Sequence, residues 1–383
     1  MPDPASSLAT ASATPPLPLH AWSRQLQQIA QQPLALRPDF PQIARRYEAW
    51  WHHDVLDRPI LQLRRNRNPS REITRRCELL DDPTAWLAAK RADAEQHEYL
   101  ADALPVVRVD FGPVLLGGLL GGRMEFEPHT SWTHPYIDED WSNAPTGAIA
   151  DDNPYWVKLR LLLDLAAAAA PGQFLVATPD LGGSADVLLN LRGPSDLCLD
   201  AIERPQTVAR TIHDIYAAWQ RAFALLYDRV VSAHGAGVVH WLELWSDRPY
   251  GVPACDFNYL IGPHEFESLC LPDIARQAAA AGRAVFHLDG PGAARHIDAL
   301  LDVPQLDAIQ FTPGAGTPST LPWIDMFRQV QQRGKSLLVF TPADEVLTLA
   351  RELNPRGLAI NAHSADDPAA LAEAFGRQYG CTA

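Results

Sequence analysis

In the second half of the chain, short apolar runs alternate with longer stretches in which apolar residues recur every three or four positions. Short, nearly continuous apolar runs, typical of buried parallel strands, end in turn or polar residues. Longer stretches between them carry apolar positions three and four residues apart, as amphipathic helices do. The runs predict strands over residues 174–178, 238–245, 284–289, 307–311, 336–340 and 357–363. The intervening stretches predict helices over residues 155–169, 204–232, 263–281, 294–301, 323–332, 344–353 and 368–379.

Alternating strands and helices imply parallel strands joined by right-handed crossovers. No dinucleotide-binding glycine fingerprint follows the first strand, which favours a closed (β/α)8 TIM barrel over an open sheet. Before these units, residues 20–53 and 82–103 have helical periodicity and flank a strand over 57–63. We therefore expect an N-terminal helical extension at 20–104 and a barrel at 105–383.

Composition narrows the class of partner. The 383 residues include 32 basic and 46 acidic ones, a net charge of −14, which argues against nucleic acid or an anionic membrane. No apolar run reaches the ~18 residues of a membrane span. Five scattered cysteines without a CxxC pair suit a reducing, cytoplasmic compartment. Residues 1–19, rich in Ala, Ser, Thr and Pro, predict a disordered leader.

Polar residues directly after the predicted strands would share one rim of a barrel, where barrel enzymes place their chemistry. These residues are Asp110, Asp180, Glu243, His287, Asp289, Thr312 and His363. Positions i and i+2 of a strand point to the same face, so His287 and Asp289 could act together as metal ligands or as an acid–base pair. Equally, Asp289 could cap a turn and His287 could be a hydrogen-bonded structural histidine.

Other residues suggest contacts to a substrate. Arg64, Arg65, Arg67, Arg71, Arg75 and Arg76 form either a solvated face or a clamp for an anionic group, and Arg64 is the candidate within them. Glu243 lies between two leucines, where a carboxylate is costly unless it is paired or functional. Trp241 and Trp245 are candidates for a pocket wall, and Cys255 for a buried thiol or a ligand. Residues 128–154 predict a long surface excursion that could serve as a lid.

Three stretches carry a resemblance to a known family. They are Thr178–Leu197, with Pro179-Asp180-Leu181-Gly182-Gly183 and Leu191-Arg192-Gly193-Pro194; Trp245–Phe266, with Cys255-Asp256-Phe257; and Phe286–Gly290. With these, residues 105–380 resemble the uroporphyrinogen decarboxylase superfamily, which includes corrinoid and coenzyme M methyltransferases. The likeness is greatest to its uncharacterised decarboxylase-like branch. It implies a barrel fold and a small-molecule substrate.

The resemblance also implies a metal. Methyltransferases of this group bind zinc through a His-x-Cys pair and a cysteine on the last strand. Here the pair is His287-Leu288-Asp289 and the last strand ends in His363, so the likeness implies a two-histidine, one-carboxylate site for a divalent metal such as zinc. Such a harder site suits activation of water or a substrate oxygen better than activation of a thiol. Glu243 and Cys255 are candidate fourth ligands.

Three functions remain open at this point. The first is a metal-dependent methyltransferase-like enzyme in which Glu243 moves a proton and arginines orient an anionic group. The second is a metal-free decarboxylase, a lyase, that uses Asp110 or Asp180 with His363, because Arg58-Pro59-Ile60-Leu61 is similar to the opening of the decarboxylase substrate motif. The third is a non-catalytic subunit that docks a corrinoid protein through residues 128–154. Family likeness also suggests a homodimer.

Overall fold

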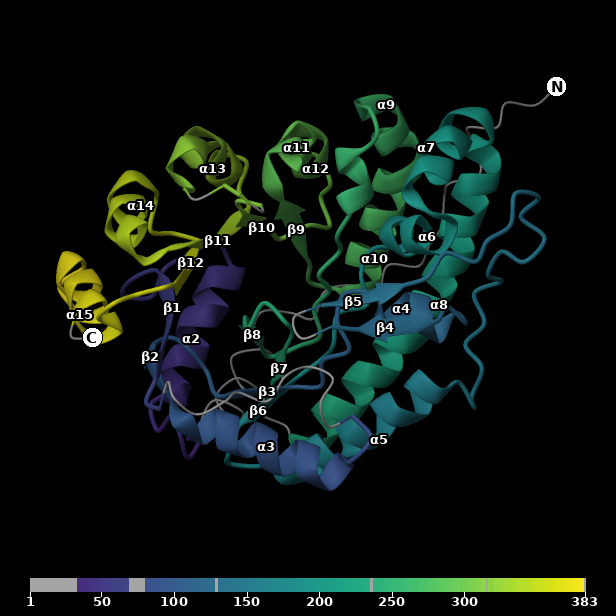
Figure 1. The fold of residues 1–383 in the computed structure, drawn as a ribbon. Coiled ribbons are helices and arrows are strands. Elements are labelled where there is room, and N and C mark those ends of the chain that lie inside the picture. The colour runs from purple at the N-terminus through teal and green to yellow at the C-terminus, as the bar shows by residue number, and fades with distance from the viewer. Residues whose placement is uncertain are drawn as a thin grey trace.

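The computed structural model describes residues 33–68, 80–127, 130–234, 237–314, 316–317 and 319–381. The predicted leader at 1–19, His129 and the arginines from 71 to 76 lie outside these ranges. Helices surround the strands, which lie toward the middle of the molecule (Figure 1). The strands form two main sheets, and most of their pairings are parallel. The predicted α/β class is confirmed.

The larger sheet contains the strand predicted to carry the site. Its strand order is β2 (His97–Ala101), β1 (Ile60–Asn66), β12 (Leu358–His363), β11 (Ser336–Pro342), β10 (Ala308–Thr312) and β9 (Val285–Asp289). All neighbours are parallel except β1 and β2. Because β1 pairs with β12, the segment predicted as a helical extension also supplies a central strand to this sheet.

The smaller sheet has the order β3 (Val106–Arg108), β6 (Leu175–Ala177), β7 (Val238–Val239) and β8 (Trp245–Ser246). Only the pairing of β7 with β8 is antiparallel. Two isolated parallel bridges, Gly251 with Ala284 and Ala254 with His287, link the chain after β8 to β9 in the larger sheet. The segment around residue 254 is thereby held beside β9.

Most helices occupy stretches with helical periodicity, whereas the helices over residues 115–119, 184–192 and 194–203 lie outside the predicted ones. They are α2 (Phe40–Trp51), α3 (Pro83–Gln96), α4 (Leu115–Leu119), α5 (Pro154–Ala169), α6 (Ser184–Arg192), α7 (Pro194–Glu203), α8 (Pro205–His234), α9 (Pro263–Glu265), α10 (Leu271–Ala281), α11 (Gly290–Ala294), α12 (Ile297–Leu301), α13 (Ile324–Gln332), α14 (Val346–Glu352) and α15 (Pro368–Gln378). Several begin with proline at the first turn, and the Asp367 side chain caps α15 by accepting from the Ala370 N–H at 3.0 Å. Among the described residues, every helix is too short or too polar to cross a lipid bilayer.

The single strand predicted over residues 238–245 is wrong. The chain reverses there, because the Glu243 N–H donates to the His240 carbonyl at 2.8 Å and Glu243 adopts a positive φ of 58°. The continuous apolar run fits a buried hairpin as well as it fits one buried strand, so periodicity could not separate them. The turn places Trp241 and Glu243 at its tip.

Trp245, predicted as a substrate contact, is fully buried and packs in the core. Its ring packs edge-on against Phe40 of α2, with centroids 6.0 Å apart, and its carbonyl accepts from the Trp51 indole N–H at 2.9 Å. Trp245 therefore belongs to the core that joins α2 to β8.

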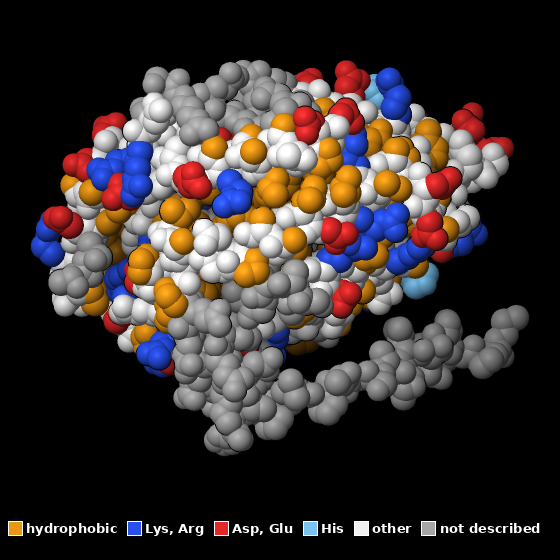
Figure 2. Space-filling view, turned by 90° about the horizontal axis from the view of Figure 1, so that it is seen from below, with side chains coloured by type: hydrophobic (Ala, Val, Ile, Leu, Met, Phe, Trp, Pro, Cys, Tyr) orange, Lys and Arg blue, Asp and Glu red, His pale blue; other side chains and the backbone are white. Residues whose placement is uncertain are grey.

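On the face of the molecule seen from below the view of Figure 1, hydrophobic, basic and acidic side chains are intermingled (Figure 2). The described part of this face is therefore a mixed surface that carries both charges.

Candidate active site

A cavity of about 470 Å³ opens beyond the ends of β3, β6 and β9. Aspartates and one histidine give it its chemistry, and we call it the acidic cavity. These residues are Asp110, Asp180, Asp186, Asp256, His287 and Asp289. The predicted rim residues Asp110, Asp180, His287 and Asp289 are thus brought together in one cavity.

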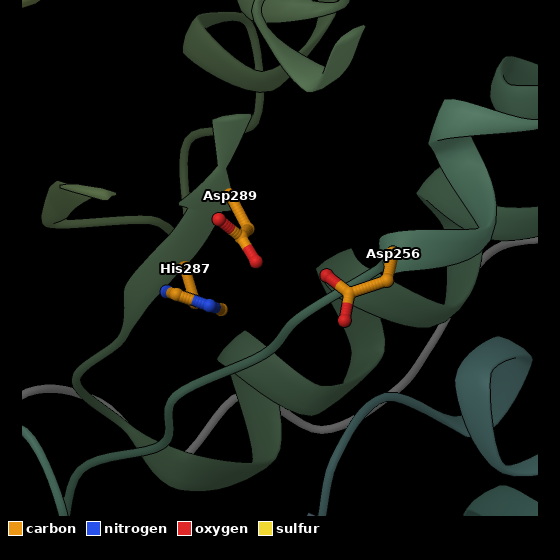
Figure 3. Close-up of side chains that lie close together, drawn as sticks. All are labelled: Asp256, His287 and Asp289. Carbon is orange, nitrogen blue, oxygen red and sulfur yellow. The ribbon is translucent and has the colours of Figure 1, made fainter. Parts of the chain in front are cut away.

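Three of these side chains could hold a metal ion. One ligand atom each from Asp256, His287 and Asp289 lie within 4.8 Å of one another. Figure 3 shows His287 and Asp289 on one face of β9, with Asp256 facing them from the neighbouring segment. The Oδ1 atom of Asp289 is buried and accepts no hydrogen bond from the described residues. A buried, unpaired carboxylate oxygen is costly, and a cation would remove that cost.

Main-chain pairing brings Asp256 to this point. The His287 N–H donates to the Pro253 carbonyl at 2.9 Å, which holds the loop before Asp256 against β9. Gly183 permits the approach on the other side, because a Cβ at that position would lie 1.9 Å from the Ala254 carbonyl oxygen. Three backbone segments thus converge where the carboxylates meet.

Gln310 on β10 orients the His287 ring. The Gln310 side-chain NH2 donates to the Thr312 hydroxyl at 2.8 Å, so its oxygen faces His287 and accepts from the ring Nδ1–H. This fixes the proton on Nδ1 and leaves the Nε2 lone pair for a metal. Gln310 is fully buried, and register pairing sets it directly beside His287.

Gln310→Leu is expected to weaken metal binding by about 10- to 100-fold, because the imidazole loses the group that fixes its tautomer and orientation. Gln310→Glu keeps an acceptor for Nδ1–H and serves as the matched control. Competition titration of Co²⁺ or Zn²⁺ against a chelator measures both variants. Equal dissociation constants for the leucine variant and the unaltered protein would contradict the assigned orientation.

The carboxylates of the acidic cavity disfavour one another's charge. Burial, together with nearby Asp256 and Asp110, raises the pKa of Asp180 to about 6, although its Oδ1 accepts from the Gly182 N–H at 2.9 Å. Burial and Asp256 likewise raise the pKa of Asp186 well above its ordinary value. Like-charged carboxylates in a buried site behave in this way unless a cation is present.

Asp180→Asn is expected to stabilise the metal-free protein by about 3 kcal/mol at pH 8 and to leave its stability nearly unchanged at pH 4. A native pKa near 6, above the ordinary 3.8, means that charging Asp180 costs stability above pH 6, and that this cost disappears as pH falls toward 4. Urea unfolding with a chelator at both pH values measures the difference. Asp325→Asn, at a side chain that is 95% exposed, is the control. Equal gains at pH 4 and pH 8 would contradict this assignment.

His363, predicted as the third metal ligand, lies elsewhere. In the larger sheet β12 is separated from β9 by β11 and β10, and three strand spacings amount to roughly 14 Å. His363 lines a second cavity of about 440 Å³ together with Arg64, Arg108, Glu243 and Asn361. We call this the basic cavity. The prediction that His363 joins His287 and Asp289 is wrong, and Asp256 takes its place among the described residues.

Glu243 is not placed as a free base. Its carboxylate accepts from the Arg108 guanidinium at 2.7 Å and forms an ion pair with Arg64. A carboxylate held by two cations is a weak proton acceptor. The predicted proton-moving role of Glu243 therefore does not fit this geometry, whereas its buried position is explained by the pairing.

The structure places Trp241 at the cavities and Cys255 away from them, although both were predicted to contact a substrate. Trp241 lines both cavities, and its ring meets His287 edge-on with centroids 5.0 Å apart. Cys255 is buried beside Cys270, and this contact together with burial raises the pKa of the Cys255 thiol. Cys255 lines neither the acidic nor the basic cavity, so the structure does not bring this predicted contact together with the other site residues.

The predicted excursion begins at the acidic cavity. The hairpin of β4 (Met124–Phe126) and β5 (Ser131–Thr133) brings Trp132 to its wall, where this side chain is 54% exposed. Sequence reasoning missed Arg108, Asp186 and Gln310 as site residues and treated Asp256 only as a loop residue. For Asp256 a signal existed, since it lies in one of the stretches that carry the family resemblance.

No family model matches the chain, and no curated protein matches it. Among solved structures, the chain is similar to a methyltransferase from Methanosarcina mazei, with a TM-score of 0.61 and 14% sequence identity. The match covers 88% of this chain and 99% of that one. At this identity the likeness shows a shared fold, and it agrees at that level with the resemblance to methyltransferases found in the sequence.

Proposed function

We propose that the chain is a metal-dependent enzyme of the methyl-transfer type that acts on a small organic molecule. The observation that carries the proposal is the meeting of Asp256, His287 and Asp289 in the acidic cavity, with an unpaired buried oxygen on Asp289. The fold shared with a methyltransferase supports the reaction class. In this proposal the two sheets are arcs of one (β/α)8 barrel, and both cavities open at the C-terminal ends of its strands.

The donor set fits a divalent cation. Two carboxylates and one imidazole suit zinc, and also iron or manganese. When bound, such an ion would supply Lewis-acid activation of a substrate oxygen or water. Two negative charges from the aspartates would balance the ion, and the neighbouring aspartates would make the cavity attractive to it.

The chain's own residues have separate tasks in this proposal. Arg64 and Arg108 orient an anionic part of the substrate in the basic cavity. Trp241 forms the wall between the two cavities and keeps water from the His287 ring. Asp180 can hold a proton because burial raises the pKa of its carboxyl to about 6 in the metal-free chain, and a bound cation would favour release of that proton.

Metal analysis and a transfer assay on the purified protein test the proposal. We expect about one equivalent of metal per chain, loss of methyl transfer after chelation and recovery when Zn²⁺ is added back. A methylated corrinoid, free or on a partner protein, is the donor to use first. Full transfer activity in metal-free protein would contradict the proposed function.

A metal-free decarboxylase remains the second candidate, because Asp110 and Asp180 face one cavity and the Asp180 carboxyl can donate a proton near pH 6. His363, the partner predicted for them, lines the basic cavity, which shares Arg108 and Trp241 with the acidic cavity. Release of CO2 from carboxylated pyrroles by chelator-treated protein would favour this candidate. A corrinoid-protein partner and a homodimer stay part of the first proposal, and sedimentation with and without such a partner tests both.

A further inference from the structure

Asp186 lines the acidic cavity, but its carboxylate is turned toward the main chain that carries one of the candidate metal ligands. Its Oδ1 atom accepts from the Phe257 N–H at 2.9 Å, and the same carboxylate accepts from the Asp256 N–H. Asp186 is not a member of the group formed by Asp256, His287 and Asp289. It therefore contacts Asp256 through the backbone and leaves the Asp256 side chain to face β9 (Figure 3).

The segment after Cys255 needs such an acceptor. Residues Asp256–Tyr259 form a short 3-10 helix, and Cys255 supplies no side-chain cap at its start. The first N–H groups of a helix have no carbonyl partner within it. Here the Asn258 N–H is the first that reaches a carbonyl of this turn, that of Cys255 at 3.3 Å. Asp186 accepts from the two N–H groups before it, as a capping residue would, although it lies on another helix.

The helix that carries Asp186 is itself fixed. Asp186 is the third residue of α6, whose first residue, Ser184, is fully buried. The Ser184 hydroxyl accepts from the Gln277 side-chain NH2 on α10 at 3.1 Å, and Ser184 donates to the Asp273 carboxylate. Gln277 also donates to Asp273 at 3.0 Å. These contacts with α10 fix the first turn of α6, and Asp186 extends that support to Asp256.

We propose that Asp186 is a positioning residue that presents the Asp256 carboxylate to the metal without binding the metal itself. The inference rests on the proposed function and deepens it, because it identifies how the third ligand reaches the other two. The strand β9 fixes His287 and Asp289, whereas Asp256 comes from a separate segment and needs a support of its own. A ligand that is held in place before binding loses less freedom when the ion binds, so such a support raises metal affinity.

Titration of Asp186→Ala and Asp186→Asn with Co²⁺ tests the positioning role. The alanine variant leaves two N–H groups without their acceptor, and we expect it to weaken Co²⁺ binding by about 10- to 100-fold. Its Co²⁺ absorption should also change, because a displaced Asp256 alters the coordination geometry. The asparagine variant keeps an oxygen for the Phe257 N–H and should bind Co²⁺ about as well as Asp180→Asn, which removes an equal charge from the same cavity. An asparagine variant as weak as the alanine variant would overturn the proposal.

Hydrogen exchange on chelator-treated protein tests the same contact without a metal. Loss of the hydrogen bonds to Asp186 is expected to speed exchange by about tenfold in peptides that contain residues 255–259 of Asp186→Ala. Asp186→Asn should exchange nearly as slowly as the unaltered protein, and peptides from α14 should be unchanged in both variants. Unchanged exchange at residues 255–259 in Asp186→Ala would overturn the proposal. Unaltered protein that binds no Co²⁺ would disprove the metal-dependent function, whereas the exchange rates separately decide whether Asp186 holds this segment.

Discussion

Replacing His287 with alanine is expected to abolish tight metal binding, with a loss of affinity of at least about 100-fold. The imidazole is the only nitrogen donor in the group that it forms with Asp256 and Asp289. Gln310 already orients the His287 ring, so in the native protein the ring needs little further ordering to bind a metal. Equilibrium titration with Co²⁺, followed by its visible absorption bands, measures both the affinity and the loss of nitrogen ligation.

His363→Ala is the matched control for this experiment. His363 was the sequence-based candidate for the third ligand, but it lines the basic cavity on β12. The alanine variant should keep the Co²⁺ affinity and spectrum of the unaltered protein. If His363→Ala loses the metal and His287→Ala keeps it, the assignment of ligands is wrong.

Asp102→Ala is expected to destabilise the protein by about 3–5 kcal/mol, the largest effect on stability that we anticipate for one side chain. Asp102 is completely buried. It accepts from Arg46 at 3.1 Å, from the Leu61 N–H at 3.0 Å, and from Arg58. Removing the Asp102 carboxylate leaves the buried guanidinium groups of Arg46 and Arg58 without this partner. It also removes the link between Arg46 on α2 and the Leu61 N–H on β1. Urea unfolding followed by circular dichroism measures the loss.

Asp39→Ala tests whether burial is the cause. Asp39 also pairs with an arginine, Arg37, at 2.8 Å, but its own side chain is 53% exposed. Solvent screens such a pair, so the expected loss is below about 1 kcal/mol. Equal losses in the two variants would show that burial of the pair at Asp102 is not what stabilises this part of the fold.

Four strands of the larger sheet, β9 to β12, could be predicted from sequence because their apolar runs are largely buried, whereas β2 lies within residues 82–103, which were predicted as helix. Continuous apolar runs placed β9, β10, β11 and β12 within one or two residues of their observed bounds. The same signal failed at residues 238–245. A buried hairpin has the same apolar run, and nothing in the residues around Glu243 signals a turn that uses a positive φ without glycine.

The site was predictable only where it lies on one strand. His287 and Asp289 follow from the two-residue period of β9. Asp256 reaches them through bridges made by Gly251 and Ala254, which are contacts between segments that no local pattern encodes. His363 was joined to them through the resemblance to methyltransferases whose last strand supplies a metal ligand, and the sequence does not give the distance across the sheet.

The proposed function depends most on where the metal binds. The most direct test is a crystal of the full chain soaked in Zn²⁺, with data collected on both sides of the zinc absorption edge. We predict one anomalous peak within bonding distance of Asp256, His287 and Asp289, and none at His363. A peak in the basic cavity, or no peak at His287 in fully soaked crystals, would contradict the central claim.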